Sequence, residues 1–136
     1  MISCIVVDDD ENTTKVFADI LTIIGLEVVA QGYDGDDAVF LYKKFRPDVA
    51  FIDIVMPQTD GFYALEKIRE FDPDAKVVAV TAEYNPDTIQ RLGKMKISAI
   101  IHKPFDKKEI KQILFEKYRI DICKSRCPKK SSTNQD

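Results

Sequence analysis

The 136-residue sequence lacks the features that mark secreted and membrane proteins. Its three cysteines are an odd number, so they do not make a disulfide framework. The N-terminal stretch Met1–Val7 is apolar, but it contains no basic residue and acidic residues follow it directly, which is unlike a signal peptide or a membrane span. We therefore expect a cytoplasmic protein of one domain with no membrane partner.

Metal-binding clusters of cysteine and histidine are also missing. Cys123 and Cys127 are four residues apart with no histidine or further cysteine beside them, so the spacing does not favour a zinc or redox role. Cys4 falls within an expected strand, where cysteine usually serves as a small buried hydrophobe. The sequence assigns no function to these thiols.

The charge is unevenly distributed along the chain. Residues 1–122 contain 16 basic and 22 acidic residues, a net charge of −6, whereas residues 123–136 contain 4 basic and 1 acidic, a net charge of +3. We expect a folded domain over 1–121 and a basic, disordered tail over 122–136. Four scattered positive charges do not indicate a nucleic-acid interface, so no direct nucleic-acid partner is predicted.

Apolar runs alternate with helical patterns along the whole domain. Because buried parallel strands are apolar on both faces, the continuous hydrophobic runs predict strands. The expected strands are 2–7, 26–30, 49–52, 76–81 and 98–102, and the expected helices are 12–24, 38–45, 61–71, 86–95 and 107–118. Gly25 and Pro47 mark helix ends, and Pro86 marks a helix start. This alternation predicts an α/β fold with a doubly wound parallel sheet.

Polar residues follow four of the five expected strands. In a parallel sheet the strand ends meet at one edge, so these side chains should lie close together. They are Asp8, Asp9 and Asp10 after the first strand, Asp53 after the third, Thr81 at the end of the fourth and Lys103 after the fifth. Neighbouring carboxylates repel one another by roughly 1 to 4 kcal/mol per pair, so Lys103 and a divalent cation should compensate them. Few protein ligands suit Mg²⁺ better than Ca²⁺.

Such a site suits phosphoryl transfer. Asp53 would be the nucleophile, and Lys103 and the Thr81 hydroxyl would bind phosphate oxygens, giving an aspartyl phosphate. A simpler interpretation of Asp53 is that its side chain only opens the next turn by accepting backbone hydrogen bonds.

Four motifs resemble those of one protein family. They are Val6-Val7-Asp8-Asp9, Asp53-x-x-Met-Pro-x-x-Asp-Gly61, Thr81-Ala82 and Lys103-Pro104-Phe105. In this order they are similar to the response-regulator receiver domains of two-component signalling, of the stand-alone chemotaxis type, over about residues 2–118. The resemblance implies a flavodoxin-like fold of five strands and five helices with strand order 2-1-3-4-5.

The resemblance also implies a site and a function. Asp53 would accept a phosphoryl group from a histidine kinase or a histidine phosphotransfer protein, and the domain would catalyse only its own phosphorylation and dephosphorylation. Mg²⁺, or alternatively Mn²⁺, would be the cofactor. Its implied ligands are Asp8, Asp9, Asp53 and the backbone carbonyl of Val55, and the implied phosphate-binding residues are Thr81, Ala82 and Lys103. A cis peptide before Pro104 is implied as well.

The sequence departs from the family pattern at the expected switch. Ile100 stands where such domains usually carry an aromatic residue that swings inward on phosphorylation, and Tyr84 is an alternative for that role. Lys96-Ile97 replaces a small Gly-Ala pair, and Val55 and Glu83 flank the route to the phosphate, where they should tune its hydrolysis. The expected docking face for a downstream partner is formed by the fourth helix, fifth strand and fifth helix, in a monomer or a phosphorylation-dependent dimer.

Two other functions are alternatives. A haloacid-dehalogenase-like phosphatase also uses an aspartate nucleophile, but it needs a second aspartate where this chain has Val55. A degenerate receiver serving only as a scaffold would not need the intact acidic cluster. His102 is either a base or phosphodonor, or a strand-end residue turned away from the carboxylates, which we expect. Asp10 is expected to favour the positive end of the first helix.

Overall fold

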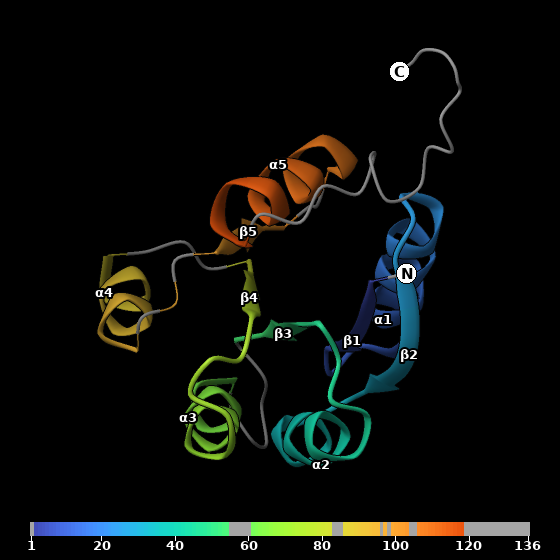
Figure 1. The fold of residues 1–136 in the computed structure, drawn as a ribbon. Helices are drawn as coiled ribbons and strands as arrows, with labels where there is room; N and C mark the ends of the chain where they lie inside the picture. The colour runs from blue at the N-terminus through green and yellow to red at the C-terminus, as the bar shows by residue number, and fades with distance from the viewer. Residues whose placement is uncertain are drawn as a thin grey trace.

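The fold is a five-stranded parallel sheet with the strand order β2-β1-β3-β4-β5 (Figure 1). The computed structural model describes residues 2–54, 61–82, 86–95, 97, 99–103 and 106–118. The strands are β1 (Ser3–Val7), β2 (Glu27–Gly32), β3 (Val49–Asp53), β4 (Val77–Thr81) and β5 (Ile100–His102). The doubly wound α/β architecture and the order 2-1-3-4-5 expected from the sequence are confirmed.

Helices cover both faces of this sheet. They are α1 (Glu11–Ile23), α2 (Gly35–Phe45), α3 (Gly61–Phe71), α4 (Pro86–Lys94) and α5 (Lys107–Tyr118). Helices α2, α3 and α4 lie on one side of the sheet, and α1 and α5 lie on the other (Figure 1). Apolar side chains of the first group form one core against the sheet, and those of the second group form another on the opposite face. The sheet is therefore buried between two hydrophobic layers, which explains why β3 and β4 are buried throughout.

Short-range signals fix where several helices begin and end. Asp10 caps α1 by accepting hydrogen bonds from the backbone N–H groups of Asn12 and Thr13, which confirms its expected place at that helix start. Gly25 follows α1 with a φ of 112°, a conformation that glycine adopts without strain. Helix α2 ends at Phe45, and its cap residue Arg46 has a left-handed φ of 47° and donates its N–H to the Tyr42 carbonyl. Pro47 after it disfavours a further helical residue.

Some boundaries differ from the expected ones. Strand β2 extends to Gly32 because it pairs with the whole of β1 through a shift in register between Cys4 and Ile5. On α1, Val16 and Ile23 are 52% and 59% exposed, so the side of the helix that packs on the sheet is narrower than its apolar pattern indicated.

Several expectations concern residues outside the described parts of the chain. These are Val55, Glu83, Tyr84, Lys96, the peptide before Pro104, Cys123, Cys127 and the tail 122–136. Within the described parts, none of the helices has the length and apolar character needed to span a bilayer.

Candidate phosphoacceptor and metal site

Asp8 lies directly after β1, and each of its two carboxylate oxygens accepts a hydrogen bond. The carboxylate accepts a hydrogen bond from the Asp10 backbone N–H at 2.9 Å through Oδ1 and one from Lys103 at 2.6 Å through Oδ2. The residue is 4% exposed. Such partners offset the cost of burying a polar side chain, so the Asp8 carboxylate is held in place at the edge of the sheet.

Asp53 is the last residue of β3, the central strand. It is also 4% exposed, and it pairs in register with Val80 of β4. The chain leaves the strand through Ile54, whose N–H donates to the Val80 carbonyl at 3.0 Å and whose own carbonyl accepts from the Gly61 N–H at 2.9 Å. These bonds hold Ile54 and Gly61 beside the end of β3.

Lys103 connects the two buried aspartates from the far end of the sheet. Its backbone N–H donates to the Thr81 carbonyl at 2.8 Å, which holds it beside β4. Its Nζ lies 2.6 Å from Asp8 Oδ2 and 3.3 Å from Asp53 Oδ2. Burial lowers the pKa of Lys103, but the hydrogen bond to Asp8 and the charges of Asp53 and Asp8 outweigh burial and raise it. The ammonium is therefore charged at neutral pH.

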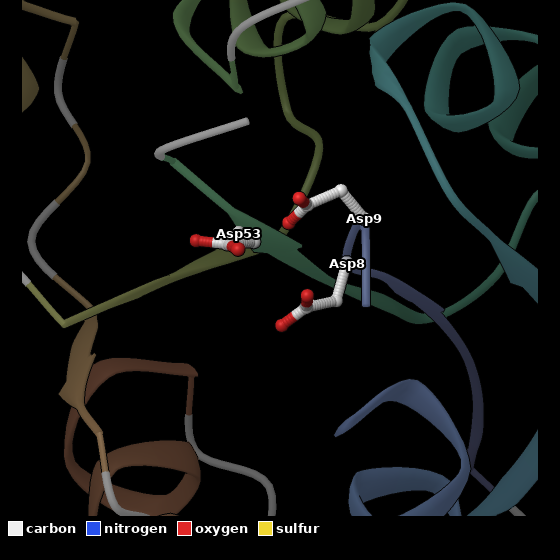
Figure 2. A group of neighbouring side chains, drawn as sticks. All are labelled: Asp8, Asp9 and Asp53. Carbon is white, nitrogen blue, oxygen red and sulfur yellow. The ribbon is translucent and has the colours of Figure 1, made fainter. Parts of the chain in front are cut away.

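Asp9 adds a third carboxylate that faces solvent. One carboxylate oxygen each from Asp8, Asp9 and Asp53 lie within 4.8 Å of one another, and Figure 2 shows the three groups gathered beside the end of β3. Three carboxylates and the Lys103 ammonium leave a net charge of −2. A hard divalent cation with oxygen ligands would neutralise that charge, and the exposed side at Asp9 leaves room for retained water, so these residues fit Mg²⁺.

Thr81 and Ala82 complete the edge next to Asp53. Thr81 ends β4 and is fully buried, whereas Ala82 after it is exposed. Ile100 begins β5, pairs with Ala79 and packs in part against the core of α2, α3 and α4. His102 is an exposed residue at the end of β5.

Residues 4–115 match the family model of the response regulator receiver domain. The chain belongs to this family. The chemotaxis protein CheY of Treponema pallidum is 40% identical over 108 residues, which is 78% of this chain and 75% of that protein. CheY of Thermotoga maritima is 31% identical over 110 residues, or 81% of this chain and 92% of that protein.

Solved structures agree with the family. A chain in the crystal structure of the CheX-CheY-BeF₃-Mg²⁺ complex from Borrelia burgdorferi has a TM-score of 0.80 and 28% identity, covering 86% of this chain and 89% of that chain. The protein is thus a receiver domain of two-component phosphorelay signalling. Receiver domains of the CheY type act as switches that interact with kinases and downstream proteins, and not as metabolic enzymes.

The receiver fold brings together most of the side chains that the strand ends predicted. Carboxylate oxygens of Asp8, Asp9 and Asp53 lie within 4.8 Å of one another, Lys103 contacts Asp8 and Asp53, and Thr81 ends the neighbouring strand. The Val55 carbonyl, expected as a further ligand, falls outside the described residues.

Two contacts that support the receiver site were not predicted from the sequence. Thr14 of α1 is fully buried, and its hydroxyl is 2.9 Å from the backbone carbonyls of both Asp8 and Asp10, so it holds the acidic turn. A Cβ on Gly61 would clash with the Asp53 carbonyl and lie 2.6 Å from the Ile54 Cα, so only glycine fits beneath the site. The Asp60-Gly61 pair predicted the start of a helix, which is where α3 begins, but it did not predict this backbone contact.

Proposed function

We propose that Asp53 accepts a phosphoryl group from a histidine kinase or a histidine phosphotransfer protein, and that the aspartyl phosphate changes which protein docks on the domain. The observation that carries this proposal is the placement of a buried carboxylate between two further carboxylates and one ammonium. A carboxylate that served only to open a turn would not need such surroundings.

Mg²⁺ is the proposed cofactor, with Mn²⁺ as the alternative. Asp8, Asp9 and Asp53 would hold it, and the Mg²⁺ in the complex from Borrelia burgdorferi supports this choice. When bound, the cation supplies positive charge that neutralises phosphoryl oxygens and the developing negative charge of the reaction.

Asp53, Lys103 and Thr81 would each have a separate role in the phosphoryl transfer. An Oδ atom of Asp53 forms a bond to phosphorus while the bond from phosphorus to the donor's imidazole nitrogen breaks, and the electron pair of that bond stays on the nitrogen. Lys103, now 3.3 Å from Asp53 Oδ2, is close enough to transfer its contact to a phosphoryl oxygen. The Thr81 hydroxyl would donate to another phosphoryl oxygen from the end of β4.

The same residues offer a path to a docking face. Thr81 pairs with His102, and Ala79 pairs with Ile100. A movement of Thr81 would therefore shift the residues of β5 that pair with β4. Ile100 is partly buried against the core and would change its packing in place of the usual aromatic residue. We propose that the face of α4, β5 and α5 responds to this change and selects the partner, in a monomer or a phosphorylation-dependent dimer.

Incubation with a phosphodonor tests the proposal. Wild-type protein, Asp53→Asn and the control Asp19→Asn, which changes an exposed aspartate of α1, are incubated with labelled acetyl phosphate and Mg²⁺. Wild type and the control should take up the label, and EDTA should abolish this uptake because it removes Mg²⁺. Asp53→Asn should take up no label in either condition. Uptake by Asp53→Asn at the wild-type rate would refute the assignment.

A second measurement tests the switch. Beryllofluoride with Mg²⁺ mimics the acyl phosphate. Amide NMR of wild type should show shifts spreading from Asp53 through Thr81 to Ile100 and α5, and Asp53→Asn should not show them. Shifts confined to the acidic edge would show that the phosphoryl group binds without changing the docking face.

A further inference from the structure

A cavity lies between α3 and α4, lined by residues other than those of the acidic cluster. Its volume is about 410 Å³, which is within the size range of ligand sites in proteins. Three lining residues come from α3, two come from α4 and one follows it: Phe62, Tyr63, Glu66, Arg91, Lys94 and Met95. None of them is one of the carboxylates of the acidic cluster or the lysine that pairs with them.

Apolar side chains form the inner part of this cavity. Phe62 is 9% exposed, and Met95 packs in part against the core of α2, α3 and α4. The Arg91 Cζ lies over the Phe62 ring, 3.8 Å from its centroid. Such a contact holds the guanidinium in place and leaves its N–H groups as donors at the edge of the ring.

The charge around the cavity is positive in an acidic domain. Arg91 and Lys94 are three residues apart on α4 and both are exposed, whereas Glu66 is the single carboxylate among the lining residues. Over the part of the chain that the structure describes, neither cation forms an ion pair within 4.0 Å, although Lys67 and Lys103 do. Among the described residues, the two neighbouring cations beside this apolar floor therefore have no ion-pair partner.

We propose that this cavity docks a segment of a partner protein that presents a carboxylate beside an apolar side chain. The carboxylate would pair with the Arg91 guanidinium, whose fork of donors suits two carboxylate oxygens, and Lys94 would add charge. The apolar side chain would contact Phe62 and Met95. Four of the six lining residues are exposed, so the cavity is open and would cover only one side of its occupant. This shape suits a peptide that lies across α3 and α4.

This site is separate from the face of α4, β5 and α5, because it lies on the side of α4 that meets α3. The proposal does not depend on phosphorylation of Asp53. A domain with both surfaces would hold one partner at the cavity while the phosphorylation state selects another.

Titration with labelled peptides tests the proposal. The probe is a ten-residue fluorescent peptide in which glutamate alternates with leucine. One control peptide has lysine for every glutamate, and another has serine for every leucine. Amide NMR follows residues 61–71 and 86–95, and fluorescence anisotropy gives the affinity. The acidic, apolar peptide should bind and shift amides on α3 and α4, whereas both controls should bind at least about tenfold more weakly.

Variants then separate docking from general electrostatics. Arg91→Ala with Lys94→Ala should weaken binding roughly tenfold or more, whereas Lys108→Ala, an exposed lysine of α5, should leave it unchanged. Glu66→Gln removes the competing carboxylate at an exposed position and should tighten binding about twofold to threefold, which tests the site without loss of a core contact.

Four outcomes would overturn the proposal. They are equal binding of the lysine or serine peptide, shifts that fall outside α3 and α4, affinity that the charge variants do not alter, and binding of phenylacetate as tightly as the peptide, which would assign the cavity to a small ligand instead.

Discussion

Replacing Lys103 by methionine should destabilise the domain most when no divalent cation is present. The substitution keeps much of the side-chain volume and removes the ammonium that lies 2.6 Å from Asp8 and 3.3 Å from Asp53. The side chains of those aspartates are only 6% and 5% exposed, so water cannot replace the lost partner fully. Removing one member of a buried ion pair typically costs about 3 to 5 kcal/mol.

Because the Lys103 side chain is itself 22% exposed, we expect the lower end of that range, a loss of about 3 kcal/mol in the free energy of unfolding. Mg²⁺ should reduce the loss. The variant site carries a net charge of −3 instead of −2, so it should bind the cation more tightly and gain more from it. A cation at 100 times its dissociation constant stabilises the folded state by about 2.7 kcal/mol.

Urea unfolding at pH 7 measures this effect for wild type, Lys103→Met and the control Lys108→Met, each in EDTA and in excess MgCl₂. The control changes an exposed lysine and should stay within about 0.5 kcal/mol of wild type in both buffers. A Lys103→Met loss below about 1 kcal/mol in EDTA, or one that Mg²⁺ does not reduce, would refute the idea that the ammonium stabilises the carboxylate cluster.

Three further results are expected. Thr14→Val should cost about 1 to 3 kcal/mol and weaken Mg²⁺ binding roughly tenfold or more, measured by urea unfolding and metal titration, because the acidic turn loses its buried hydroxyl; full affinity would contradict this. Gly61→Ala should destabilise the domain by about 1 to 3 kcal/mol, whereas Gly93→Ala in α4, where a Cβ meets nothing within 4 Å, should stabilise it by about 0.5 to 1 kcal/mol in the same urea assay; equal effects would contradict the clash. Burial, together with the charge of Glu27, raises the pKa of the Cys4 thiol from 9.0 to about 12. The unfolded chain therefore loses this proton at lower pH than the folded one, so the free energy of unfolding falls as the pH rises above 9.0. Between pH 8 and pH 10.5 the wild type should lose about 2 kcal/mol of stability relative to Cys4→Ala, and a stability difference that stays constant over this range would contradict the shift.

The positions of the main site residues followed from the sequence because strand ends are easily recognised in a parallel sheet. Asp8, Asp53 and Lys103 each follow a short apolar run, and parallel strands place such residues at one edge whatever lies between them. The contact between Lys103 and both aspartates was expected only as a general compensation of charge. Which oxygen each nitrogen approaches depends on packing that spacing alone does not determine.

Other features depend on contacts that a linear pattern does not contain. A threonine inside a helix usually faces either solvent or its own helix, so nothing in the sequence marked Thr14 as a support for the acidic turn. The apolar spacing of α1 included Val16 and Ile23, but only one side of that helix packs against the sheet and these two side chains face solvent.

The ion pairs of Lys103 with Asp8 and Asp53 determine when, during folding, the site at Asp53 is complete. Its two partners lie 95 and 50 residues earlier in the chain, so the charge balance at Asp53 is completed only when the last strand docks beside β4. A nascent chain still short of β5 would present its acidic residues without their counter-charge, and a proteolytic fragment ending there would do the same. Phosphorylation would then be restricted to molecules that have finished folding, and the ability to accept a phosphoryl group would report the integrity of the whole sheet.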